Sequence, residues 1–225
     1  MENARERRVR RAEELVRQKM RGNDASHDEW HVWRVREIAL SLAHEEGLSS
    51  NPDSMEIIEL AALLHDIGDY KYARDPSEKA IVENFLVEER LDGSKLSKIL
   101  RIIEQMGFQN ELDSNASGEL FPEFGVVQDA DRLDAIGAIG IARCFTFGGS
   151  RGRVLHDPKM LPRNSLSKES YIKREDQTTI NHFHEKLLKL KDLMKTKAGR
   201  IRAEKRHKFM EIFLDEFYAE WCGQA

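Results

Sequence analysis

The sequence predicts an all-α protein that folds as a single domain. Almost every segment repeats apolar residues at helical spacing, and no stretch alternates apolar and polar residues as a half-buried strand would. The 225 residues contain no internal repeat and no clear linker, and a chain of this length is sufficient for one substantial core. We therefore expect a basic N-terminal helix at 1–22, packed on or flanking a main domain at 23–225.

Composition narrows the class of protein. Hydrophobic residues make up 40% and charged residues 34% of the chain, as in a soluble globular protein with a charged surface. A net charge of −4 does not suit a general binder of nucleic acid, and no run approaches the roughly 20 apolar residues of a membrane span. The two cysteines, Cys144 and Cys222, lie far apart, which indicates a reducing compartment, the cytoplasm, and argues against a thiolate zinc site.

The first 21 residues are rich in arginine. Acidic residues are interspersed among the arginines, and apolar residues recur at helical spacing from Val9 to Met20. We interpret the segment as a folded helix with a solvated charged face rather than as a targeting signal. Contact with RNA through this helix stays open as an alternative.

A helix is predicted at 26–47. It begins at Ser26, with Glu29 in capping-box spacing. Its apolar stripe includes His31, which shares a face with His27, so periodicity alone does not separate these two histidines.

The next predicted helix, at 53–68, ends in a polar pair. It begins at Asp53, and its apolar stripe leads to His65 and Asp66 just before Gly68. In the last turn of a helix the dipole disfavours a negative charge by about 0.3 to 1 kcal/mol, and burial costs more unless a cation pairs with the carboxylate. A metal ion would satisfy both requirements, with the neighbouring imidazoles as further ligands.

The remaining predictions concern two glycines, one long loop and five more helices. Gly137 and Gly140 are expected to allow close approach of a neighbouring helix, and a long loop with glycines, prolines and scattered cations is expected at 148–168. The other predicted helices lie at 77–90, 94–106, 123–146, 169–196 and 199–221.

A further carboxylate is expected downstream of the histidine–aspartate pair. Asp129, Asp131 and Asp134 all fall on the otherwise apolar helix at 123–146. Spacing leaves open which of them completes a metal site.

These motifs resemble those of the HD-domain metal-dependent phosphohydrolase superfamily, in particular its small stand-alone bacterial and plant branch. The resemblance covers about residues 24–220 and implies the helical bundle of an HD domain. It rests on ordered stretches of the chain: HDEWHVWRV (27–35), AALLHDIGDYK (61–71), DADRLDAIGAIGIAR (129–143) and TTINHFHEKLLKLKDLMKT (178–196).

The resemblance implies four metal ligands: His31, His65, Asp66 and Asp131. His31 is preferred to His27 because the first histidine of the superfamily is followed four residues later by an aliphatic residue, here Val35. In the superfamily the last metal-binding aspartate is followed by a basic or small residue, a large apolar residue and often an acid. Arg132, Leu133 and Asp134 follow Asp131 in that order. Asp129 is then expected at the surface or behind the ligands.

The ligand set implies one divalent cation as cofactor. Two nitrogens and two carboxylates leave open positions on an octahedral ion, which suits Mn²⁺ first, with Mg²⁺, Co²⁺ and Fe²⁺ as alternatives. Dinuclear members of the superfamily carry extra histidines between the HD pair and the last aspartate, and residues 67–130 contain none.

Five further residues are predicted in the site, Asp69 and Arg132 with support from the same resemblance. Asp69 matches a position beside the scissile phosphate, and we assign it as the catalytic acid/base that orients or deprotonates water. Lys71 and Arg132 are the predicted phosphate contacts, and His27 and His182 are predicted to line the mouth of the pocket. A structural or surface role is the alternative for each of them.

The resemblance implies hydrolysis of a nucleotide, first of all of (deoxy)nucleoside triphosphates to monophosphate and pyrophosphate. The cations of the loop at 148–168 also suit a polyphosphate tail better than a single phosphate. A 5′-nucleotidase acting on monophosphates is the alternative enzyme. A nucleotide-binding regulatory module with low turnover is the alternative outside catalysis. Besides the nucleotide, a second copy in a homodimer is the partner that the branch suggests.

Overall fold

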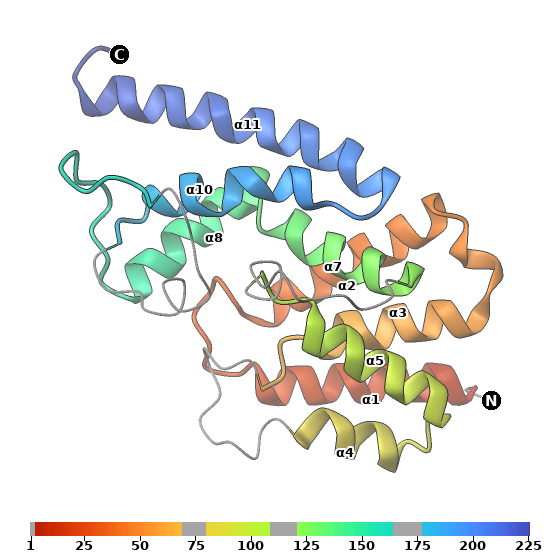
Figure 1. Cartoon of the computed structure of the whole chain (residues 1–225). Helices are drawn as coiled ribbons and strands as arrows, with labels where there is room; N and C mark the ends of the chain where they lie inside the picture. The colour runs from red at the N-terminus through yellow and green to blue at the C-terminus, as the bar shows by residue number, and fades with distance from the viewer. Residues whose placement is uncertain (1–2, 69–79, 109–120, 164–176) are drawn as a thin grey trace.

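The computed structural model describes residues 3–68, 80–108, 121–163 and 177–225. Within these ranges the chain is helical or irregular and contains no strand (Figure 1), which confirms the all-α prediction. The elements are α1 (Ala4–Lys19), α2 (Glu29–Glu45), η1 (Leu48–Ser50), α3 (Pro52–Leu64), α4 (Ile81–Glu88), α5 (Gly93–Gln105), α7 (Pro122–Asp134), α8 (Gly137–Ser150), α10 (Asn181–Glu185), η3 (Leu187–Leu193) and α11 (Lys197–Trp221).

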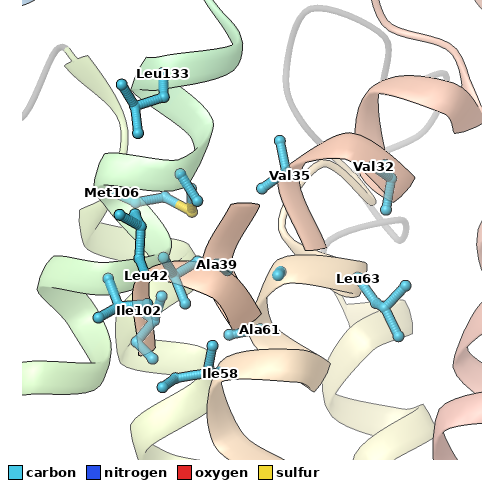
Figure 2. Packing of buried hydrophobic residues seen from close by; sticks show 14 of the residues in the cluster. Val32, Val35, Ala39, Leu42, Ile58, Ala61, Leu63, Ile102, Met106 and Leu133 are labelled. Carbon is cyan, nitrogen blue, oxygen red and sulfur yellow. The ribbon is translucent and has the colours of Figure 1, made fainter. Parts of the chain in front are cut away.

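The centre of the molecule is formed by α2, α3 and α7, which pack against one another. Side chains from α2, α3, α5 and α7 gather between these helices (Figure 2), and Leu42, Ile58 and Ile102 have no exposed surface there. Burying one such side chain stabilises the fold by about 1.5 to 3 kcal/mol. The polar residues that these helices carry are therefore held in fixed relative positions.

The N-terminal helix α1 packs on α3 through an apolar face. Its arginines pair with acids that are buried beneath it: Arg5 Nη2 lies 2.8 Å from Glu59 Oε2, and Arg8 Nη2 lies 2.5 Å from Glu56 Oε1. A buried carboxylate would be strongly destabilising without such a partner. Part of the positive charge of α1 is thus neutralised by buried acids of the same chain, which does not favour a role in RNA binding.

The first residues of α2 and α3 differ from the prediction. Asp28 caps α2 by accepting a hydrogen bond from the His31 amide at 3.1 Å, whereas Ser26 is buried before the helix. Asn51 caps α3 by accepting from the Asp53 amide at 3.0 Å. The predicted caps were wrong because each start offers two residues with capping side chains, and spacing does not rank them.

The single helix predicted at 123–146 is two helices, α7 and α8. The chain is extended at Ile136, with φ −127° and ψ 164°, and Gly137 follows with φ +76°. A Cβ on Gly137 would lie 3.0 Å from the Arg206 side chain of α11, so close approach of a neighbour is confirmed there. Gly140 instead faces the backbone that joins α7 to α8.

The C-terminal third is less regular than predicted. The helix predicted at 169–196 is wrong where the structure describes it, because a short α10 gives way to η3 at Lys186, with φ −133°. The last predicted helix, at 199–221, is confirmed by α11. The loop predicted at 148–168 begins only after α8 has ended, and its described part is 151–163.

Asp129 fastens α7 to the start of α11. Its buried carboxylate accepts hydrogen bonds from the backbone N–H groups of Lys195 and Thr196 and from Thr196 Oγ1, at 2.7 to 3.0 Å. The expectation of a surface acid or an acid behind the ligands is therefore wrong. The carboxylate serves as an anion at the N-terminal end of a helix, where the dipole favours it.

Gly199 allows this contact, because a Cβ there would lie 2.4 Å from Asp129 Oδ2 and 2.6 Å from Thr196 Oγ1. Gly199→Ala should lower the free energy of unfolding by about 1 to 3 kcal/mol through overpacking, as measured by urea denaturation. Gly149→Ala is the matched control, since nothing lies within 4 Å of a Cβ at that helical position. Equal losses in the two variants would contradict the assigned contact.

Candidate metal centre

Histidine and aspartate side chains from three helical segments converge in the interior. Ligand atoms of His31 on α2, His65 at the end of α3 and Asp131 on α7 all lie within 4.8 Å of one another. The two Nε2 atoms are 3.3 Å apart, and Asp131 Oδ1 lies 3.5 Å and 3.9 Å from them. Neighbouring ligands around one ion with bonds of about 2.1 Å are roughly 3 Å apart, which is close to this arrangement.

Asp66 adds a second carboxylate to the cluster. Its Oδ2 lies 3.3 Å from His31 Nε2, and its Oδ1 lies 3.4 Å from His65 Nε2. Among the described residues, Oδ2 is buried and accepts no hydrogen bond. A buried carboxylate oxygen without a donor is unfavourable, so this oxygen has lone pairs available for a cation. We call His31, His65, Asp66 and Asp131 the HD centre.

The other ring nitrogen of each histidine is already engaged. His31 Nδ1–H donates to Asp134 Oδ2 at 2.8 Å, and His65 Nδ1–H donates to the Ala62 carbonyl at 2.8 Å. Since Nδ1 carries the proton in both neutral rings, both Nε2 atoms present lone pairs to each other. Two lone pairs at this distance require a positive charge near them. The residues of the HD centre thus fit a divalent cation.

Asp134 holds His31 in this orientation. Arg34 Nε donates to Asp134 Oδ1 at 2.7 Å, and Arg143 Nη1 donates to Oδ2 at 3.0 Å. Burial raises the pKa of Asp134, but His31 and the two arginines outweigh burial and hold that pKa well below its usual value. The sequence analysis missed this role, although Arg34 follows His31 and Asp134 follows Asp131 at the spacing of one helical turn.

The charges of the HD centre shift one another's protonation. Burial raises the pKa of Asp66, but the adjacent His65 and His31 lower it well below its usual value. Burial and the Arg143 charge lower the pKa of His31, while its contacts with Asp134 and Asp66 raise it, and the net pKa is raised. The pKa of Asp66 is lowered by the imidazoles beside it, and the pKa of His31 is raised by the carboxylates beside it. The negative charge of these carboxylates also attracts a cation.

Two of the predicted catalytic and phosphate-binding residues, Asp69 and Lys71, lie outside the described residues. His27 lies at the edge of the HD centre, with its ring centroid 5.9 Å from that of His31. Its Nδ1 is 2.8 Å from Ser26 Oγ. The structure therefore brings one predicted pocket residue beside a predicted ligand.

The structure gives Arg132 a packing role. The residue is 4% exposed, and its Nη1 donates to the Leu193 carbonyl at 2.7 Å, which connects α7 to η3. His182 lies on α10, which packs on η3. Contact of either residue with a substrate stays a prediction.

Comparison with known proteins identifies the family. The family model described as HD domain matches residues 30–136, a range that includes the whole HD centre. YpgQ of Bacillus subtilis, an uncharacterised protein, is 34% identical over 201 residues, which cover 88% of this chain and 86% of YpgQ. This chain belongs to the HD-domain family.

Solved structures of HD-domain relatives extend the likeness to nearly the full chain. A Lactobacillus plantarum protein is 34% identical with a TM-score of 0.83, covering 97% of this chain and 98% of its own. An HD-superfamily hydrolase of Bacillus thuringiensis is 37% identical with a TM-score of 0.70, covering 98% and 100%. YpgQ in complex with ADP is 30% identical with a TM-score of 0.73, covering 97% of each chain.

The three structures match 97% or 98% of this chain, so only a few residues remain unmatched. Since α1 has 16 residues, most of it lies within the fold that these relatives share. Among the described helices, none combines the length and apolar character that crossing a membrane requires.

Asp134→Asn tests the support of His31. The substitution keeps the shape of the side chain but removes the charge that orients the imidazole, so the affinity for Mn²⁺ should fall about 10- to 100-fold in isothermal titration calorimetry. Asp53→Asn, at an exposed acid of α3, is the control and should leave the affinity unchanged. Undiminished affinity of a folded Asp134→Asn protein would show that the contact does not support the metal ligand.

Proposed function

We propose that this HD-domain protein is a metal-dependent phosphohydrolase that cleaves (deoxy)nucleoside triphosphates to monophosphates and pyrophosphate. The observation that carries the proposal is the HD centre. Two imidazole nitrogens and two carboxylates meet there, and one oxygen of the Asp66 carboxylate is buried without a hydrogen-bond donor among the described residues. The presence of ADP in a structure of YpgQ supports a nucleotide as the substrate class.

The four side chains of the HD centre would hold one divalent cation, with Mn²⁺ as our first choice. When bound, such an ion lowers the pKa of a water molecule and draws charge from a phosphoryl oxygen. Asp134 keeps His31 aligned through Nδ1, so the ligand does not rotate as charge develops. We assign to Asp69 the task of orienting or deprotonating the attacking water.

Cations that reach the HD centre only through the rings of Phe147 and His27 favour a polyphosphate substrate. The ring of Phe147 lies 5.8 Å from that of His27, and the Cζ atoms of Arg151 and Arg153 lie 5.3 Å and 5.2 Å from the centroid of Phe147. A guanidinium group can neutralise phosphate oxygens that lie beyond the reacting phosphorus. Arg163 of the same loop instead pairs with an acid of α10 at 2.7 Å, so the first part of the loop is the better candidate.

The product assay is the direct test of this activity. Purified protein with Mn²⁺ and a nucleoside triphosphate should release one nucleoside monophosphate and one pyrophosphate per turnover, separated by anion-exchange chromatography. Inertness toward triphosphates together with release of orthophosphate from monophosphates would replace the proposal with a 5′-nucleotidase. Tight nucleotide binding without turnover would replace it with a regulatory module.

Asp66→Ala serves as the matched loss-of-function variant in this assay. Removal of one carboxylate ligand should reduce kcat/KM by at least about 100-fold. Asp53→Ala removes an exposed acid from the same segment and should leave kcat/KM unchanged. Unchanged turnover by the Asp66→Ala protein would contradict a role for the HD centre in the reaction.

A further inference from the structure

One arginine of α8 joins two parts of the chain that adjoin the HD centre. Arg143 Nη1 donates to Asp134 Oδ2 at 3.0 Å, at the end of α7, and Arg143 Nε donates to the Ser26 carbonyl at 2.7 Å, shortly before α2. The Arg143 side chain is 11% exposed, and Ser26 has no exposed surface. Two different nitrogens of one planar group make these contacts, so the guanidinium fixes both segments at once.

The two contacts of Arg143 differ in how much depends on them. Asp134 also accepts two hydrogen bonds from Arg34, at 2.7 Å and 3.1 Å, and one from His31 at 2.8 Å. In the part of the chain that the structure describes, the Ser26 carbonyl has no second donor. Loss of Arg143 would therefore remove one of several supports of Asp134, but the whole support of the Ser26 carbonyl.

Ser26 belongs to a short turn that carries His27. An ionised carboxylate can only accept, so Ser26 Oγ–H donates to the Asp24 carboxylate, and the same oxygen accepts the Nδ1–H of His27 at 2.8 Å. The His27 amide also donates to the Asp24 carbonyl at 3.0 Å and closes the turn. The backbone position of Ser26 therefore sets the orientation of the His27 imidazole.

We propose that Arg143 is a positioning residue, which holds His27 at the edge of the HD centre through Ser26 and so sets the affinity for nucleotide more than the affinity for metal. The His27 ring lies 5.9 Å from that of His31 and 5.8 Å from that of Phe147 on α8, so it adjoins both the HD centre and the helix that carries Arg143. The inference rests on the proposed function in taking a nucleotide as the ligand, and on the predicted place of His27 at the mouth of the pocket.

Arg143→Lys separates the two contacts. The substitution keeps a positive charge beside Asp134, but one nitrogen replaces the fork and does not also bind the Ser26 carbonyl. Isothermal titration calorimetry with Mn²⁺ alone should give an affinity close to that of the parent protein. Titration with a nucleoside triphosphate whose α,β-bridging oxygen is replaced by methylene, at saturating Mn²⁺, should give a dissociation constant about tenfold higher.

Arg34→Gln is the reciprocal variant. It removes two hydrogen bonds of Asp134 and none of Ser26, so it should lower the Mn²⁺ affinity more than Arg143→Lys does and the nucleotide affinity less. Arg10→Gln, at an exposed arginine of α1, is the control and should leave both affinities unchanged. A folded Arg143→Lys protein with unchanged nucleotide affinity would overturn the inference, and so would one that loses as much Mn²⁺ affinity as Arg34→Gln.

A double-mutant cycle shows whether Arg143 acts through His27. His27→Ala alone should weaken binding of the methylene analogue by about tenfold, and adding Arg143→Lys should weaken it no further. Independent effects that multiply to about 100-fold would contradict the positioning role, as would a parent protein that does not bind the analogue. Binding needs no turnover, so a protein that follows this pattern but releases no pyrophosphate would contradict the proposed function alone.

Discussion

The burial of the Asp66 carboxylate beside His31 and His65 is the constraint on which the rest of the structure depends. The carboxylate follows the C-terminal end of α3, where the helix dipole disfavours negative charge, and it lies 3.3 Å and 3.4 Å from two imidazole nitrogens. Only a positive charge among these atoms makes their burial favourable. The apolar packing of α2, α3 and α7 keeps the four side chains of the HD centre together, so the core preorganises the centre.

The helix α7 connects this centre to the remainder of the fold. Asp131 faces the HD centre, Asp134 orients His31 one turn later, and Asp129 binds the backbone at the start of α11. Helical geometry explains the division, because residues three apart share a face and residues two apart do not. One short segment therefore supplies a side chain of the HD centre, the support of another, and the anchor of α11.

The helices and the histidine–aspartate pair could be predicted from the sequence, because they depend on local spacing. Spacing did not decide among the three aspartates of α7, since only the fold shows Asp129 turned toward α11. The break at Gly137 and the irregular chain at Lys186 were missed for a related reason. At the first, Gly137 adopts φ +76°, which the spacing of apolar residues does not reveal, and the second interrupts a pattern that reads as continuous helix. Metal ligation and the chemistry assigned to Asp69 rest on resemblance and stay predictions.

Diffraction at the manganese absorption edge from crystals grown with Mn²⁺ tests the central claim most directly. The account predicts one anomalous peak per chain, about 2.2 Å from Nε2 of His31 and of His65 and from one carboxylate oxygen each of Asp66 and Asp131. A second peak within the cluster, a peak that Asp66 does not touch, or no peak between the two histidines would contradict it.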